Sequence, residues 1–343
     1  MRLLPLVFIF SAAIAAADTP AKKPPVLAGV DVFGAHRVSA DELVAAAGFT
    51  IGMPAALDDP AFDKAIEDAT AAIKAKWDFA FVKVSPINYF GTGPDAGKTY
   101  VTIDVVEKGD EARMKFAAAP KGTVKDPAGL VAAWNAYEDK MWPLLQKGEL
   151  EVGKCRGGLH CALGFGHDSL RDLEDAFIDG APKHWRALRD VLRKDKDVAK
   201  RAAAAFVLAY AGPADRVVTA LVPSIDDPSG LVRNNVVRVL VEIQEKSKKP
   251  IVPVGPLLRA LRMPEVTDRN KAAYALQYLV ATDPDRFRAQ VLKEAGDTLV
   301  EMTALAQPNN RDPAVAILTS LAGKDLGSPA AWRAWVNAQR SPK

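Results

Sequence analysis

The stretch ALVPSIDDPSGLVRNNVVRVLVEI, residues 220–243, decides the fold of the C-terminal half of this chain. It continues the short apolar run RVVTALVPSI, which reads as a helix and stops at DDPSG, a cluster of turn-forming residues. A longer apolar run, LVRNNVVRVLVEIQ, follows at once and reads as a second helix. The stretch therefore predicts one unit of the form helix, turn, helix.

The same unit recurs along the chain. The runs VAKRAAAAFVLAYAG, LVRNNVVRVLVEIQ and VTDRNKAAYALQYLV align on an arginine that is followed seven residues later by a leucine. A fainter copy is NNRDPAVAILTSLAG. The pairs are Arg201 with Leu208, Arg233 with Leu240, Arg269 with Leu276, and Arg311 with Leu318. Successive arginines stand 32, 36 and 42 residues apart, which is the range of helical solenoid repeats.

These units resemble HEAT repeats, because DDPSGLVR matches the turn between repeats of that family and the arginine that follows it. The resemblance implies a right-handed α-solenoid of stacked helical hairpins over about residues 168–340. We expect the repeated arginines to pair with turn aspartates such as Asp197, Asp227 and Asp268 rather than with a ligand. The basic run HWRALRDVLRKDKDVAKR also contains aspartates, so we interpret it as a solvated helix face.

The segment 26–109 has a different pattern, with the order β-α-α-β-β. Alternating residues around Val30 and Val32 predict a strand. Ser39 with Glu42 forms a capping box, and Gly48 ends the helix that begins there. A second helix is predicted at about 58–77, and two further β runs, FAFVKVSPIN and KTYVTIDVVEKG, follow it.

This order resembles a POTRA domain, the periplasmic module that precedes outer-membrane assembly barrels, in GVDVFGAHRVSADEL, AAIKAKWDFAFVKV and YVTIDVVEKG. No barrel sequence follows, so the resemblance does not extend to an assembly pore. The strand at 79–88 is predicted to be a sheet edge because it contains Pro86, which cannot donate to a ladder. Phe79, Phe81 and Lys83 are the candidate partner-binding residues of this edge. The alternative is that Pro86 and Lys83 only protect the edge from pairing.

The first residues have the layout of a secretory signal peptide. Arg2 precedes the apolar LLPLVFIF, and small residues lead to a cleavage point predicted after Ala17. We therefore expect an exported protein, most simply periplasmic, without membrane insertion. Association at the periphery of an outer-membrane or envelope complex is compatible with the POTRA resemblance.

The segment 110–167 reads as a linker and a helical cap that carries both cysteines of the chain. Asp126 is the expected helix cap, Pro127 is expected in the first turn, and Pro143 is expected to kink or break the helix. In an exported protein Cys155 and Cys161 are expected to form a disulfide. The alternative is a zinc site made by Cys155, His160, Cys161 and His167. The spacing of the cysteines does not fit a Cys-x-x-Cys redox couple.

Composition and missing motifs exclude several functions. The formal net charge of +3 gives no concentrated basic signal, so nucleic acid is not an expected partner. The chain has no Gly-x-Ser-x-Gly elbow, no phosphate-cradling glycine loop and no His-Glu-x-x-His motif, so we assign no catalytic residue and no cofactor. The prediction is a non-enzymatic, multidomain α+β and all-α scaffold that binds protein partners. A metal-binding or metal-sensing role of the Cys155–His167 loop is the alternative.

Overall fold

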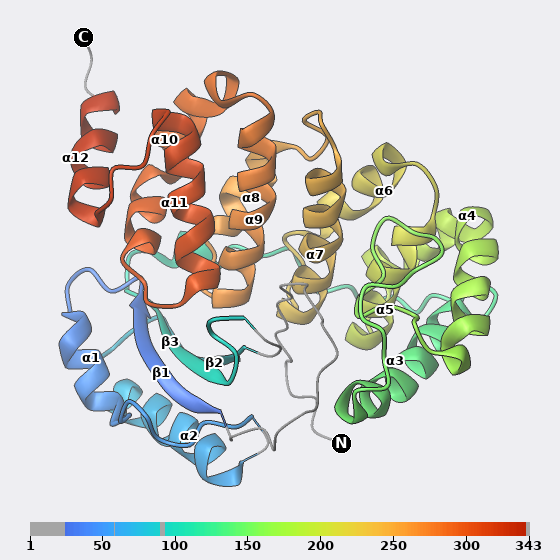
Figure 1. Cartoon of the computed structure of the whole chain (residues 1–343), viewed down its shortest axis with the longest axis horizontal. Helices are drawn as coiled ribbons and strands as arrows, with labels where there is room; N and C mark the ends of the chain where they lie inside the picture. Colours follow the sequence, from blue (N-terminus) through green and yellow to red (C-terminus); the bar gives the residue numbers. More distant parts are fainter. Residues whose placement is uncertain (1–24, 58, 90–92, 341–343) are drawn as a thin grey trace. The chain divides into compact units, whose positions relative to one another are not determined.

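The computed structural model describes residues 25–57, 59–89 and 93–340 (Figure 1). The predicted signal peptide, residues 1–17, and its cleavage point after Ala17 lie outside the described residues. The described part is mostly helical and contains one three-stranded sheet. No helix in residues 25–340, apart from the two undescribed gaps, has the length and apolar character to cross a membrane.

The chain divides into two compact units that are not consecutive in sequence. The first unit consists of residues up to Lys115, with 261–273 and 285–343. The second consists of 116–260 and 274–284. The sheet thus groups with the C-terminal helices, and helix α9 (Val266–Thr282) has residues in both units.

The first unit begins with the β-α-α-β-β order expected from the sequence. Its elements are β1 (Val26–Phe33), α1 (Ala40–Ala47), α2 (Pro60–Lys76), β2 (Phe81–Asn88) and β3 (Lys98–Val106). The predicted capping box is confirmed, because the Ser39 hydroxyl accepts a hydrogen bond from the Glu42 N–H and the Glu42 carboxylate accepts one from the Ser39 N–H. Gly48 ends α1 with a positive φ of 72°, which glycine adopts without strain.

The three strands are ordered β1-β3-β2. β1 runs parallel to β3, and β2 runs antiparallel to it. Helices α1 and α2 cover one face of the sheet (Figure 1), where Leu43, Phe62 and Ile73 pack against Val101 and Ile103 of β3. Alternation along β3 places Val101 and Ile103 on this face of the sheet and their neighbours in the strand on the opposite face.

The opposite face of the sheet carries two buried carboxylates. Asp104 of β3 accepts a hydrogen bond from the N–H of Val266, the first residue of α9, at 2.9 Å. Asp31 of β1 accepts from the N–H groups of Ala306 at 2.7 Å and Gln307 at 2.9 Å. Gln307 is the N-cap residue of α11 (Pro308–Ala322), which lies over this face in Figure 1. The N-terminus of a helix has unpaired N–H groups and positive potential, so each carboxylate caps one helix end.

The remaining helices follow in chain order. They are α3 (Leu130–Lys147), α4 (Arg171–Lys194), α5 (Val198–Val207), α6 (Ala214–Leu221), α7 (Gly230–Lys246), α8 (Val254–Leu261), α10 (Pro284–Thr303) and α12 (Pro329–Arg340). In the second unit α3 packs on α4 and α5, and α5 packs on α7. Trp134 of α3 lies at the centre of this packing, against the rings of Phe177 and Phe206.

Helix α3 starts later than the sequence suggested. The N-cap residue is Gly129 and not Asp126, but the Asp126 carboxylate accepts from the N–H groups of Val131 and Ala132 in the first turn, both at 3.0 Å. The expectation that Pro127 occupies the first turn is wrong, since Ala128 and Gly129 have positive φ and turn the chain before the helix begins. Pro143 does not break the helix, which continues to Lys147.

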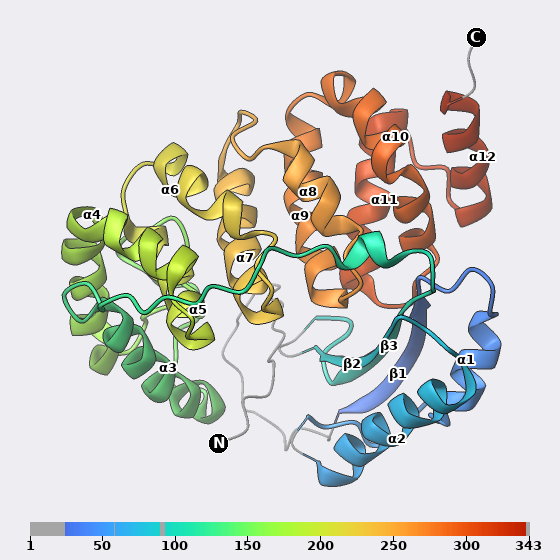
Figure 2. The same ribbon diagram turned by 180° about the vertical axis from the view of Figure 1, so that it is seen from behind.

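The segment 116–124, expected to be part of a linker, belongs to the second unit and forms hydrogen bonds with its turns (Figure 2). The N–H of Ala117 donates to the carbonyl of Asp226 at 2.7 Å. Further along, Gly122 forms a β-bridge with Asp195, and the Asp195 carboxylate accepts from the N–H of Val124 at 2.8 Å. This extended segment of the chain therefore lies along the turns of two successive repeats.

Candidate functional site

Both outer strands of the sheet are candidates for binding an extended polypeptide. Among the described strands, β1 and β2 each pair with β3 alone, so each has one edge without a neighbouring strand. The edge of β1 is occupied at its first two residues, because the Leu27 N–H donates to the Met53 carbonyl and the Leu27 carbonyl accepts from the Gly52 N–H. Unpaired N–H and C=O groups on an edge are a template for an added strand.

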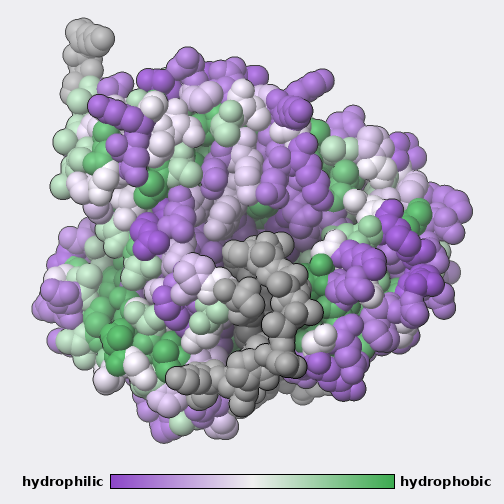
Figure 3. Space-filling model, in the orientation of Figure 1, coloured by the Kyte–Doolittle hydropathy of each residue, from purple (hydrophilic) through white to green (hydrophobic). Residues whose placement is uncertain are grey.

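A cleft of about 590 Å³ borders β1. Its apolar lining includes Val30 and Val32 of β1, Val44 of α1 and Leu305 after α10. Apolar residues gather over β1 and α1 on the face shown in Figure 3, at lower left. Two carboxylates at the cleft are already engaged: Glu301 accepts from the N–H of Gly34 at 2.8 Å, and Asp297 pairs with Arg333 at 2.6 Å.

A second hollow, of about 610 Å³, lies where α2 ends and β2 begins. Trp77, Phe79 and Phe81 contribute aromatic side chains to it. The Trp77 and Phe79 rings are 6.3 Å apart, and the ammonium of Lys76 lies 4.5 Å from the Trp77 ring centre. The predicted partner-binding residues Phe79 and Phe81 thus line one hollow at the start of an edge strand.

Lys83, the third predicted edge residue, has a different role. Its ammonium pairs with the carboxylate of Glu265, which stands directly before α9. The side chain keeps about a third of its surface exposed, at 37%. Lys83 therefore connects β2 to the helical part of the first unit, and any effect on strand pairing is additional to this contact.

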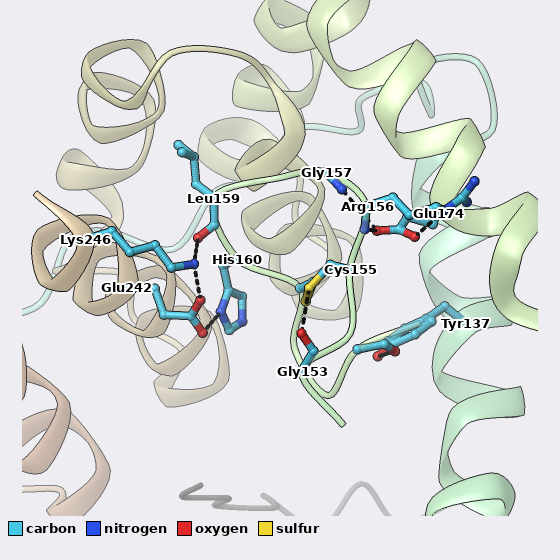
Figure 4. The surroundings of a disulfide bond; sticks show 12 residues. Tyr137, Gly153, Cys155, Arg156, Gly157, Leu159, His160, Glu174, Glu242 and Lys246 are labelled. Atoms are coloured by element: carbon cyan, nitrogen blue, oxygen red, sulfur yellow. Dashed lines mark hydrogen bonds and ion pairs between the residues drawn. A yellow bond between two sulfur atoms is a disulfide. The ribbon is translucent and has the colours of Figure 1, made fainter. Parts of the chain in front are cut away.

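The predicted disulfide between Cys155 and Cys161 is present (Figure 4). It closes the disulfide loop, which we define as residues 150–167. Backbone hydrogen bonds fold this loop on itself, from Gly153 N–H to the Leu163 carbonyl at 3.1 Å and from Phe165 N–H to the Lys154 carbonyl at 2.7 Å. Gly158 has a φ of 80° and lies so close to the Tyr210 ring that an added Cβ would come within 2.8 Å of it.

Side chains of the disulfide loop attach it to two helices. Arg156 donates from Nε to Glu174 of α4 at 3.0 Å, and its backbone N–H donates to the same carboxylate at 2.7 Å. His160 is buried, with Nδ1 against the Glu242 carboxylate of α7 and its ring stacked on Phe206 at 5.2 Å (Figure 4). Burial lowers the pKa of His160, because desolvation penalises the charged imidazolium more than Glu242 favours it.

The structure does not bring the four predicted zinc ligands together as a set. The sulfurs of Cys155 and Cys161 are bonded to each other, and His160 faces Glu242. His167 contacts the hydroxyl of Ser169 at 2.8 Å. Over the described ranges, no group of three or more histidine, cysteine, aspartate or glutamate side chains is placed to hold a metal ion.

The repeated arginines have structural partners. Arg201 forms a two-point ion pair with Asp227, at 2.9 and 3.0 Å, and donates to the carbonyls of Asp195 and Lys196. The expectation of a turn aspartate is thus confirmed for Arg201, whereas Asp197 caps α5 by accepting from the N–H of Ala199. The partner of Arg201 instead comes from the following repeat.

Arg269 obtains its partner from the sheet. Its guanidinium pairs with Asp104 of β3 at 2.7 Å, and both side chains are fully buried. The expectation of a turn aspartate is therefore wrong for Arg269, because its partner stands in a strand. The guanidinium also lies 3.6 Å from the centre of the Phe33 ring. Burial raises the pKa of Asp104 to about 6, although Arg269 and the Val266 N–H both favour the ionised carboxylate.

Comparison with known families supports the helical part of this description. The family model for HEAT repeats matches residues 186–277. The matched region contains Arg201, Arg233 and Arg269, the three arginines on which the repeats align. No curated protein matches the chain.

Proposed function

We propose that this chain is an exported, non-enzymatic scaffold that binds other polypeptides. HEAT repeats commonly mediate protein–protein interaction, and stacked helical repeats offer extended surfaces for it. The observation that carries the proposal is that each open edge strand of the sheet borders a hollow with apolar side chains, at β1 and at the start of β2.

An added strand is the occupant that fits this arrangement. Backbone hydrogen bonds to an edge supply affinity, and pockets beside the edge select alternate side chains of the guest. We therefore propose an extended segment with apolar side chains as the ligand. The segment 116–124 supports a similar use of the repeats, because it binds their turns largely through its own backbone.

Export to the periplasm and the POTRA likeness of residues 26–109 belong to the same proposal. A disulfide that closes a short loop is typical of proteins in an oxidising compartment. The β-α-α-β-β order supports a POTRA-like module, and the match to HEAT repeats supports a helical solenoid, for which we propose a right-handed twist. Export is tested by determining the N-terminus of the mature protein after expression in cells with and without the export machinery.

The binding proposal is tested with peptides rather than cell extracts. A displayed library of extended peptides is selected on the full chain, and the affinity of each selected peptide is measured. Ala304→Trp fills the cleft beside β1, and Phe79→Ala empties the hollow at β2; both positions belong to these sites. Matched controls are Ala71→Trp, on the exposed face of α2, and Ile51→Ala, at an exposed apolar position.

We expect one of the two site variants to weaken binding about tenfold or more, while its control stays within about twofold. Hydrogen exchange should slow in the strand beside the affected hollow when the peptide binds. If peptides bind but neither site variant alters their affinity, the edge proposal is wrong even though the repeats still bind polypeptides.

A further inference from the structure

A concentrated positive surface lies on α4 around Trp185. Trp185, Arg189 and Arg193 recur every four residues, so they share one face of the helix. The guanidinium carbons of Arg186, Arg189 and Arg216 lie 4.7, 5.6 and 5.5 Å from the Trp185 ring centre. A single aromatic ring thus gathers three guanidiniums, of which Arg216 comes from α6.

Few negative charges balance this group. Asp190 pairs with Arg189 at 3.1 Å and with Lys194 at 3.0 Å. Arg193 and Arg216 instead donate to uncharged backbone carbonyls, those of Thr219 and Ala220 and that of Ala211. These bonds fix the side chains without neutralising them. Mostly hydrophilic residues cover α4 in Figure 3.

The arginines also keep unused donors. Within the described ranges, Nε of Arg189 and Nε of Arg193 are buried and have no hydrogen-bond acceptor. Arg186 is exposed. Burial first, and then the neighbouring charge of Arg189, lower the pKa of Arg193, while Asp190 partly offsets them; the two guanidiniums, one helical turn apart, therefore repel each other. An anion placed here would relieve the repulsion between the guanidiniums.

We propose that Trp185, Arg186, Arg189, Arg193 and Arg216 form a binding site for a phosphate group. The planar fork of arginine matches phosphate oxygens, and a doubly charged phosphate has enough acceptors for several forks at once. Trp185 is a positioning residue that holds the guanidiniums against their mutual repulsion. The phosphate comes either from a free anion or from a lipid headgroup, and the surface is separate from the strand edges proposed above.

Two probes distinguish these sources. Inorganic pyrophosphate is titrated into the full chain by calorimetry, and the chain is sedimented with phosphatidylcholine vesicles that contain or lack phosphatidylglycerol. Pyrophosphate binding indicates a free anion, whereas binding to the phosphatidylglycerol vesicles alone indicates a headgroup. The test variant is Arg186→Gln with Arg216→Gln, and its charge-matched control is Lys293→Gln with Lys324→Gln, at two exposed positions outside α4 and α6.

We expect the arginine variant to weaken binding of the responding probe at least about tenfold, and the lysine control less than about twofold. Trp185→Leu keeps the charge and should still weaken binding several-fold, because the guanidiniums lose their common support. Circular dichroism confirms that each variant folds. The proposal is overturned if neither probe binds the unaltered chain, or if the arginine and lysine variants lose binding equally, which would show diffuse electrostatic attraction.

Discussion

Exchanging Asp104 for asparagine should destabilise the first unit strongly. Asp104 and Arg269 are both completely buried, and their ion pair joins β3 to α9. Asparagine preserves the size of the side chain and can still accept from the Val266 N–H. The substitution therefore removes mainly the negative charge, and the guanidinium of Arg269 stays buried without its counter-charge.

The size of the effect follows from these contacts. Removing one partner of a buried ion pair costs about 3–5 kcal/mol, because the remaining charge is uncompensated. Arg269 retains a carbonyl acceptor at Pro264 and the Phe33 ring at 3.6 Å, which recover about 1 kcal/mol. We expect the free energy of unfolding of the first unit to fall by about 3 kcal/mol.

Urea unfolding and hydrogen exchange read by mass spectrometry measure this change. Exchange should accelerate in residues 98–106 and 266–273, which belong to the first unit, and remain unchanged in α4 of the second. Adding Arg269→Met removes the uncompensated positive charge, so the double variant should be more stable than Asp104→Asn alone. The coupling energy of the pair should reach about 2 kcal/mol.

Two results would refute this reasoning. A loss below about 1 kcal/mol for Asp104→Asn would mean that the charge pair adds little beyond packing. A coupling energy near zero would mean that Asp104 and Arg269 act independently.

Three further outcomes are expected. Burial lowers the pKa of His160, so its contribution to stability is present above the ordinary value near 6.5 and is lost as pH falls below it; between about pH 7 and pH 5 the unaltered chain should therefore lose more stability than His160→Gln in paired urea titrations. Replacing Cys155 and Cys161 with serine should cost about 2 kcal/mol and accelerate exchange in the disulfide loop. Ser39→Ala, which removes the cap of α1, should lower the free energy of unfolding by about 1 kcal/mol, which thermal unfolding records as a lower melting temperature.

Each of these has an internal control. The other titrating groups are common to both chains, so their pH dependence cancels when the unaltered chain and His160→Gln are subtracted. The cysteine variants should leave exchange in β3 unchanged; acceleration there would show that the loop has a wider role. Ser229→Ala is the matched control for Ser39→Ala, since Ser229 precedes α7 without forming a side-chain cap bond. Equal losses for the two serines would count against the capping explanation.

The candidate sites were only partly accessible from sequence. Pro86 identified β2 as an edge, because proline lacks the N–H that a central strand needs. The cleft beside β1 was missed, because it combines β1 and α1 with residues 297–305 and Arg333, whose approach no local pattern encodes. The hollow at β2 is lined by the consecutive residues 74–82, so its aromatic side chains were visible in the sequence but the hollow between them was not. The partner of Lys83 lies 182 residues away, so spacing gave no indication of it.

Local sequence was sufficient wherever neighbouring residues supply both halves of an interaction. The capping box of Ser39 and Glu42, the recurring helical hairpins and the disulfide of the Cys155–Cys161 loop all belong to this class. The contacts of Asp31 and Asp104 do not belong to this class. A charged residue within an apolar strand was a visible signal, but only the folded chain shows that each carboxylate caps a helix more than 150 residues away. A carboxylate satisfies any helix N-terminus or guanidinium equally well, so its partner is selected by the packing of distant segments.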